Sequence, residues 1–314
     1  MVRYFVYRLL SAIPILCIVS LVSFLLIFLV PGDPATEIAG PGATAEEVAR
    51  IRHSLGLDQH LGVQMLTYYD RLLRGDLGRS ILLNRSVTTA FLERVPVTLS
   101  LTGLALTISL GLAIVLGILA AVRQNTWVDQ GAMTVALLGL SLPDFWVGLV
   151  MIYLFAVLLG WFPTGGYVEL SKGIRPWLTS LLMPAIALGM AQLGLLARIT
   201  RASMMEVLGQ DYVRTARAKG VPEQRVIEKH ALANTLIPIV TVIGLIVGIV
   251  LGGAVVVEQV FALPGIGRLI IGAILRRDYP VIQGGLLLTA GIFVFVNLAV
   301  DVLYAWLDPR VHYG

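Results

Sequence analysis

The residues whose types could support covalent chemistry surround Ser141. Gly139-Leu140-Ser141-Leu142 matches the first part of the G-x-S-x-G pattern of serine nucleophiles, but Pro143 replaces the final glycine. A serine nucleophile also needs a base within hydrogen-bond reach. All histidines of the chain lie outside its long apolar segments: His53, His60, His230 and His312. A membrane-embedded hydrolase is therefore disfavoured.

Nucleotide and metal chemistry lack their sequence patterns as well. A P-loop needs a lysine between a glycine and a serine or threonine, and none of Lys172, Lys219 and Lys229 stands there. The HExxH motif is absent, and the scattered histidines do not form a spaced metal cluster. We expect no cofactor and no metal on this chain. If ATP drives its action, ATP and Mg²⁺ bind to another chain.

Acids and glycines inside apolar segments are the next candidates, because ionised groups are costly in a membrane and usually face a partner or water. Asp144 follows Pro143 within a span, and Asp301 lies near the end of the last span, where Arg198 or Arg201 could pair with it. Small residues four apart let helix backbones approach closely. Either helix packing or a translocation path explains the candidate set, which is Asp144, Gly244, Gly248 and Gly252.

The composition is that of a membrane protein. Of the 314 residues, 57% are hydrophobic and 13% are charged, against about 25% charged in soluble domains. The single cysteine, Cys17, excludes an intramolecular disulfide. Six apolar segments are long enough to span a bilayer: about 9–30, 97–122, 132–159, 178–199, 236–257 and 284–307. Pro143 and Pro184 lie inside two of them, where membrane helices tolerate kinks.

Two outer loops are predicted to carry short amphipathic helices. In residues 31–96, Thr44 opens a helix that Gly56 ends, and a second helix covers 64–74. After the fifth span, an apolar stretch at 268–275 is too short to cross the membrane. We expect it to form a helix at the outer mouth, flanked by Pro264, Gly265, Gly267, Arg276, Arg277 and Asp278.

The distribution of basic residues predicts the orientation. With the long loop 31–96 set aside, eleven lysines and arginines lie on the side of the termini and five on the opposite side. The termini, and the basic stretch 211–238 with them, are therefore expected in the cytoplasm. In this stretch Asp211 is predicted to cap a helix that Gly220 ends, and Pro222 to open a second short helix with Glu223 in its first turn.

This basic stretch resembles the cytoplasmic loop of ABC importer permeases, in which Glu-Ala-Ala is followed by three residues and a glycine. Arg214-Thr215-Ala216 and Gly220 match it, although the glutamate is missing. The sequence RTARAKG (residues 214–220) is similar to this loop in the dipeptide, oligopeptide, glutathione and nickel branch of these permeases. Further matches run along the whole chain: Pro31-Gly32-Asp33-Pro34, Gly75-Asp76-Leu77-Gly78, Pro264-Gly265-Ile266-Gly267, Arg277-Asp278-Tyr279-Pro280, Asp301-Val302-Leu303-Tyr304 and Asp308-Pro309-Arg310.

The resemblance implies an all-α membrane protein of six transmembrane helices, the type I ABC importer permease fold. Its parts would be a first span with an outer helical loop (1–96), a permease core (97–307) with a coupling loop at 200–235, and a cytoplasmic tail (308–314). The implied ATPase-coupling residues are Asp211, Tyr212, Arg214, Thr215, Ala216, Arg217, Ala218, Lys219, Gly220, Pro222 and Glu223.

The implied assembly is a bacterial inner-membrane importer of di- or oligopeptides. This non-catalytic subunit would pair with a homologous permease, two cytoplasmic ATPase subunits and a soluble extracytoplasmic binding protein, and it would bind no nucleic acid. Glutathione, nickel or another small solute is the alternative cargo. An ion channel, which needs no docking loop, and a membrane enzyme are the rival classes. The sequence does not identify the solute.

Overall fold

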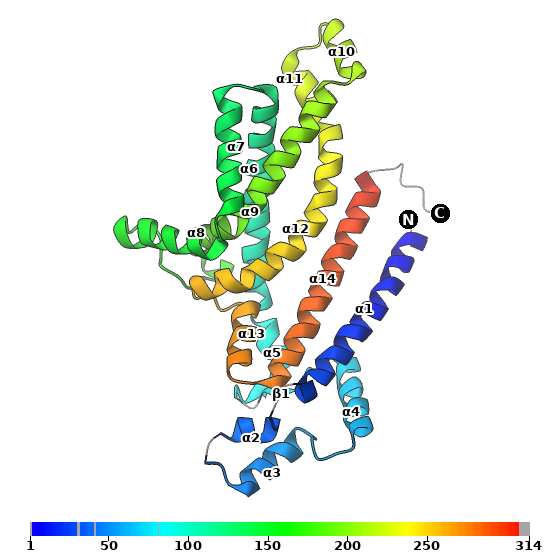
Figure 1. Cartoon of the computed structure of the whole chain (residues 1–314), viewed down its shortest axis with the longest axis vertical. Coiled ribbons are helices and arrows are strands. Elements are labelled where there is room, and N and C mark those ends of the chain that lie inside the picture. The colour runs from blue at the N-terminus through cyan, green and yellow to red at the C-terminus, as the bar shows by residue number, and fades with distance from the viewer. Residues whose placement is uncertain (1, 30–31, 41, 81, 308–314) are drawn as a thin grey trace. The chain divides into compact units, whose positions relative to one another are not determined.

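The computed structural model describes residues 2–29, 32–40, 42–80 and 82–307, with side chains excepted at 2–8, 237, 241 and 300–307. Pro31, His312 and the predicted tail 308–314 lie outside the described residues. Figure 1 shows the chain as helices joined by short connections. In the described ranges, five helices are long and apolar enough to cross a membrane, and a bent pair makes a sixth crossing if it is counted as one span.

The N-terminal third of the chain contains one long helix and several short elements. The long helix is α1 (Val2–Leu29), and its apolar part is Leu9–Leu29. The short elements are α2 (Pro34–Ala39), α3 (Ala45–Ser54), α4 (Leu61–Leu73), β1 (Arg79–Ser80), β2 (Arg85–Ser86) and α5 (Val87–Leu92).

The rest of the chain is almost entirely helical. The α-helices are α6 (Val95–Val122), α7 (Trp127–Ser141), α8 (Asp144–Met151), α9 (Ile174–Leu208), α10 (Asp211–Ala218), α11 (Glu223–Arg225), α12 (Leu232–Val260), α13 (Ile266–Leu275) and α14 (Tyr279–Leu307). A π-helical segment, η1 (Ile152–Leu158), extends α8, and another, η3 (Val226–Ala231), joins α11 to α12. A 3₁₀ turn, η2 (Leu170–Lys172), precedes α9.

The helix signals read from the outer loop are confirmed in part. Thr44 caps α3 in a reciprocal capping box: the Glu47 amide donates to Thr44 Oγ1, and the Thr44 amide donates to Glu47 Oε2. Gly56 follows the helix with φ +69°. The next helix begins at Leu61, three residues earlier than predicted, because the His60 ring accepts the Gly62 amide and serves as its cap.

One compact unit consists of residues 1–96 together with 265–295. Residues 265–295 join the N-terminal part, since α13 and the start of α14 share a core with α5. Buried Phe91 lies in this core with Ile266 and Val281. The β1–β2 pair is antiparallel, with Arg79 opposite Ser86.

The second unit covers residues 97–264 and 296–314, and α9 is its central element. This helix packs against α7, α8 and α12. About two-thirds of its most apolar 18-residue stretch is buried. Close contacts between backbones depend on glycines. A Cβ on Gly194 would lie 2.2 Å from the Ala136 carbonyl oxygen, and one on Gly139 would lie 2.6 Å from the Met190 carbonyl oxygen. Figure 1 shows α7 alongside α9.

The third predicted span, 132–159, is not a single kinked helix. It is broken between α7 and α8 by a bend of 105° (Figure 1). Proline disfavours helical geometry in the residue before it, so Leu142 is extended (ψ 130°) and Pro143 becomes the N-cap of α8. The sequence located the interruption, but the change of direction is far larger than the kink expected from one proline.

Candidate functional site

The predicted coupling residues form a compact element between α9 and α12. Helix α10 follows α9 after a two-residue break at Gly209 and Gln210. On its inner face, buried Val213 and Ala216 pack with Val226. This small apolar cluster holds α10 against the segment that leads into α12.

Gly220 ends α10 as predicted, in the left-handed conformation with φ +77°. Two other details of the prediction are wrong. Gln210, and not Asp211, is the N-cap of α10; Asp211 is its first helical residue, where an acid also suits the helix dipole. Pro222 is an N-cap and not the first helical residue, and the segment it opens is not a separate helix. Residues 223–260 are helical without a break, through η3 and past Pro238, which lies inside α12.

An ion pair crosses the Gly220 turn. The Arg217 guanidinium donates to both carboxylate oxygens of Glu223, with Nη2–Oε1 at 2.6 Å and Nε–Oε2 at 3.0 Å. This hydrogen bonding lowers the pKa of Glu223 and raises that of Arg217. Both side chains are about half exposed, at 40% and 53%, so the pair orients the turn more than it stabilises it.

Tyr212 fastens the other end of α10. Its hydroxyl accepts a hydrogen bond from Asn234 Nδ2 at 2.8 Å and donates to the His230 carbonyl oxygen at 3.3 Å. The outward face stays open: the side chains of Asp211 and Arg214 are 96% and 73% exposed. Further exposed residues of the predicted set are Thr215, Ala218, Lys219 and Pro222. The element therefore offers a rigid surface, bonded on its inner side and open on its outer side.

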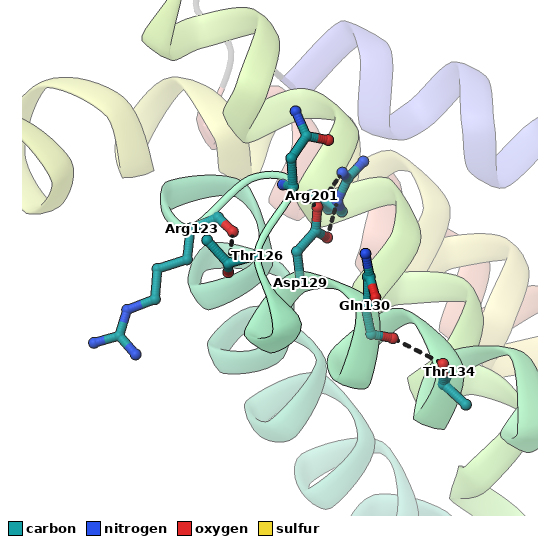
Figure 2. Close-up of polar contacts among 7 residues, drawn as sticks. Arg123, Thr126, Asp129, Gln130, Thr134 and Arg201 are labelled. Carbon is teal, nitrogen blue, oxygen red and sulfur yellow. Dashed lines mark hydrogen bonds and ion pairs between the residues drawn. The ribbon is translucent and has the colours of Figure 1, made fainter.

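Sequence reasoning missed an ion pair between α7 and α9. Arg201 donates to both oxygens of Asp129, with Nε–Oδ1 and Nη2–Oδ2 each at 2.6 Å, as Figure 2 shows. Asp129 is buried and also accepts the Asn125 amide at 3.0 Å. Arg201 was expected to have Asp301 as a possible partner; its described partner is Asp129, and the Asp301 side chain lies outside the described ones. The available signal in the sequence was an acid near the start of a span, because an acid in that position usually needs a basic partner.

The glycines among the translocation-path candidates lie four apart on α12 and differ in burial. Gly244 is buried, Gly248 is half-buried, and a Cβ on Gly252 would meet no atom within 4 Å. Gly139 and Gly194 allow close contacts between α7 and α9, and Gly117 and Gly189 do so between α6 and α9. Asp144 is half-buried in the first turn of α8, and its Oδ2 lies 3.3 Å from where a Cβ on Gly253 would be. No described group forms an ion pair with Asp144.

The predicted outer helix is present as α13, with Gly265 as its N-cap and Gly267 buried within it. Arg276 is exposed, whereas Arg277, in the left-handed region with φ +54°, pairs with Glu37 at 2.7 Å. Asp278 is buried and accepts a hydrogen bond from the Ser80 hydroxyl. Burial raises the pKa of Asp278, and the Ser80 hydrogen bond opposes this effect. Pro264 precedes this helix.

Two catalytic alternatives find no support in the geometry. The Ser141 hydroxyl donates to the Leu137 carbonyl oxygen at 2.8 Å, which is a bond within its own helix. Among the described residues, no three His, Cys, Asp or Glu side chains come together where they could hold a metal ion.

Two family models together match nearly the whole chain. Residues 113–313 match the binding-protein-dependent transport system inner membrane component, and residues 1–102 match the N-terminal part of the same system's membrane component. The chain belongs to this family. It is an inner-membrane ABC importer permease, and permease subunits of this kind are non-catalytic membrane components.

Full-length relatives agree with this assignment. A protein of Brucella suis biovar 1, named as a peptide transport system permease protein, is 50% identical over 306 residues and covers 98% of each chain. The glutathione transport system permease protein GsiC of Salmonella choleraesuis is 44% identical over 313 residues and covers all of both chains. The membrane part of the MetNI methionine ABC transporter has the same fold, with a TM-score of 0.56 at 18% identity over 69% of this permease and 96% of that chain.

Proposed function

We propose that this permease forms half of the translocation pathway of an ATP-driven importer of short peptides. The observation that carries the proposal is the element around α10, which is fixed on its inner side by Val213, Tyr212 and Arg217 and open on its outer side. Such an element can transmit the motion of a docked protein to α9 and α12, because it is bonded to the beginning of α12 and follows directly after α9.

The proposed partners follow from the family and from what the chain lacks. The chain has no P-loop, so ATP and Mg²⁺ would bind to two cytoplasmic ATPase subunits, and α10 would dock to an ATPase subunit. A homologous permease would form the other half of the pathway, and a soluble extracytoplasmic protein would deliver the solute. The charge asymmetry supports cytoplasmic termini. Labelling of Pro222→Cys from outside intact cells would contradict that orientation.

Peptides are the favoured cargo because the Brucella suis relative, at 50% identity, is named for peptide transport. Glutathione, itself a small peptide, is the second candidate, supported by the 44% identity to a glutathione permease. The test is uptake by the reconstituted complex of this chain with its partners, using a labelled dipeptide and labelled glutathione side by side. ATP-dependent accumulation of the dipeptide supports the proposal, and accumulation of glutathione alone selects the alternative. Accumulation of neither solute in a complex that hydrolyses ATP contradicts both.

A further inference from the structure

The N-terminal unit contains a cavity of about 950 Å³ that no predicted site includes. Its lining comes from α1, the α3–α4 connection, α4, the β1–β2 hairpin and the start of α14, all within this unit. Small-molecule sites typically measure about 300–1,000 Å³. The cavity is therefore large enough for a molecule of several residues.

One wall is a single face of α4. Gln64, Tyr68 and Arg71 are spaced i, i+4 and i+7, so their side chains lie on the same side of the helix, and all three line the cavity. Phe24 of α1 and Leu287 of α14 supply an apolar part of the lining, and the Phe24 ring packs against the Tyr68 ring with the centroids 5.4 Å apart. Amide, phenol and guanidinium groups thus line the same cavity as apolar side chains.

The charge of the lining is mainly positive and only partly neutralised. Arg85 is paired with Glu93 at 2.8 Å. Arg79 is held by the Asn84 carbonyl oxygen at 3.2 Å and the Asn84 side-chain oxygen at 2.9 Å, neither of which is charged. No described acid pairs with Arg71. The single lining carboxylate, Asp76, accepts the Gly78 amide.

Two further polar side chains of the lining are His53 and Tyr68. His53 lines the cavity and is paired with Asp58 at 2.7 Å. The Tyr68 hydroxyl is buried, and no described atom meets it in hydrogen-bond geometry; the Ser23 hydroxyl beside it donates instead to the Gln283 carbonyl oxygen at 3.1 Å. Two guanidinium groups that pair with no described acid, and one phenol that bonds to no described atom, therefore line the same cavity.

A guanidinium group presents a fixed fork of N–H donors that matches the two oxygens of a carboxylate. We propose that this cavity binds a short peptide by its free C-terminal carboxylate, with Arg71 and Arg79 as the anion-binding residues and Tyr68 as a neutral donor. The apolar side chains of the lining would contact the peptide's side chains, and Gln64 and Gln283 would form hydrogen bonds with its amides. The choice of a peptide rests on the proposed function, whereas the preference for an oxyanion rests on the arginines alone. A phospholipid phosphate offers the same oxyanion chemistry.

The test uses the full chain in nanodiscs of phosphatidylcholine, titrated with a dipeptide and with its C-terminal amide, and saturation-transfer NMR as the measure of binding. We expect the free acid to saturate and the amide to bind roughly tenfold more weakly, because the amide has no charge to pair with the guanidinium groups. Arg71→Gln and Arg79→Gln should each weaken binding of the acid by about the same factor. Arg71→Lys, which keeps the charge and loses the fork, should fall between Arg71→Gln and the native chain.

Arg74→Gln is the matched control. Arg74 lies on the same helix, is paired with exposed Asp70 at 2.8 Å and does not line the cavity, so this variant should bind like the native chain. Equal binding of the acid and the amide would overturn the proposal. It would also be overturned if the Arg71→Gln and Arg79→Gln variants melt normally and bind the acid as well as Arg74→Gln does. Absence of saturable binding would also overturn it.

A lipid arm separates the two oxyanion sources. Nanodiscs that contain phosphatidylglycerol are examined by native mass spectrometry. The cavity would be assigned to a lipid headgroup if the native chain, but not Arg71→Gln, retains that lipid and if the native chain no longer binds the dipeptide in these nanodiscs. That result would overturn the peptide proposal. Binding is measured without ATPase or uptake, so failure here leaves the importer proposal untouched. Failure of uptake likewise leaves the cavity result standing.

Discussion

Arg201 of α9 and Asp129 of α7 form a two-point ion pair, with both N–O distances at 2.6 Å (Figure 2). Gly194 and Gly139 bring the same two helices into backbone contact further along. Helix α9 also leads directly into α10. The ion pair therefore lies at the α7–α9 contact on the helix that leads to α10, where it would help to position the proposed coupling surface.

Removal of one partner should be more harmful than removal of both. Arg201→Gln leaves Asp129, whose side chain is 6% exposed, without compensation, and we expect a loss of about 3 kcal/mol in stability. The double variant Arg201→Gln/Asp129→Asn should recover much of that loss, as measured by thermal unfolding in detergent. Arg198→Gln, an exposed arginine one turn away, is the control and should be neutral. A double variant no better than the single one would remove the pairing argument.

The Gly220 turn can be tested by separating backbone strain from side-chain clash. A Cβ on Gly220 meets no atom within 4 Å, so only its φ of +77° opposes a side chain. Gly220→Val should cost about 1–2 kcal/mol locally and misplace α10, whereas Gly220→Asn, which tolerates this region, should cost less. Uptake and stimulation of ATP hydrolysis by solute in the reconstituted complex are the measurements. Equal coupling by both variants at equal abundance would show that the turn is not used.

The contact between α7 and α9 predicts a contrast between two glycines. Gly194→Ala places a methyl group 2.2 Å from the Ala136 carbonyl oxygen, so the helices must separate at a cost of about 1–3 kcal/mol. Gly252→Ala enters open space and should be neutral or slightly stabilising, because alanine favours a helix. Melting temperatures in one detergent give the comparison. Equal melting of the two variants would contradict the packing assigned to α9.

Asp278 predicts a pH dependence on the N-terminal unit. Burial raises its pKa above the ordinary value of 3.8, so the folded state holds the proton more strongly than the unfolded chain. Its contribution to stability is full below about pH 3.8 and is lost as the pH rises through the raised value. Asp278→Asn stays neutral and keeps the Ser80 contact, so its stability advantage over the native chain should grow from pH 4 to pH 7. An advantage independent of pH would show that the carboxyl group does not titrate in this range.

The features that sequence reasoning located correctly are local. The Thr44 capping box and the left-handed Gly220 are set by residues within a few positions of each other, and both are present. The bend after Ser141 was located, but its angle depends on how α8 packs against α9 and α12, which one proline does not determine. The glycine face 244–252 was chosen by spacing alone, and spacing cannot show which helix lies opposite.

Long-range pairs were out of reach for the same reason. Asp129 and Arg201 are 72 positions apart, and Ser80 and Asp278 are 198 apart, so nothing in the sequence near either member identifies the other. In the coupling element, the exposed basic residues were predicted from the loop pattern. The continuity of α11, η3 and α12 was missed, because Pro222 reads locally as the start of a new short helix.

Asp144 tests whether the bend between α7 and α8 takes part in transport. The sequence leaves two hypotheses: a carboxylate that lines a cavity on the path, and a carboxylate that is buried against an arginine or protonated and has no role in transport. The described part of the chain supplies no arginine partner, and the carboxylate lies at the N-terminus of α8, close to Gly253 of α12 and well placed to interact with the helix dipole.

Asp144→Asn keeps the shape and removes the charge, so it distinguishes the two hypotheses. If the carboxylate faces the path, it attracts the ammonium end of a peptide. The variant should then take up free-amine peptides several-fold more slowly than the native chain does and N-acetylated peptides at the native rate, while the complex melts normally. Dipeptide uptake with and without N-acetylation, together with the melting temperature, provides the measurement. Ser141→Ala, which also lies at the bend, is the control and should not discriminate between the two peptides. Unchanged uptake of both peptides by Asp144→Asn would exclude a role in the path, and a lowered melting temperature with equal uptake would point to a structural pair with another subunit.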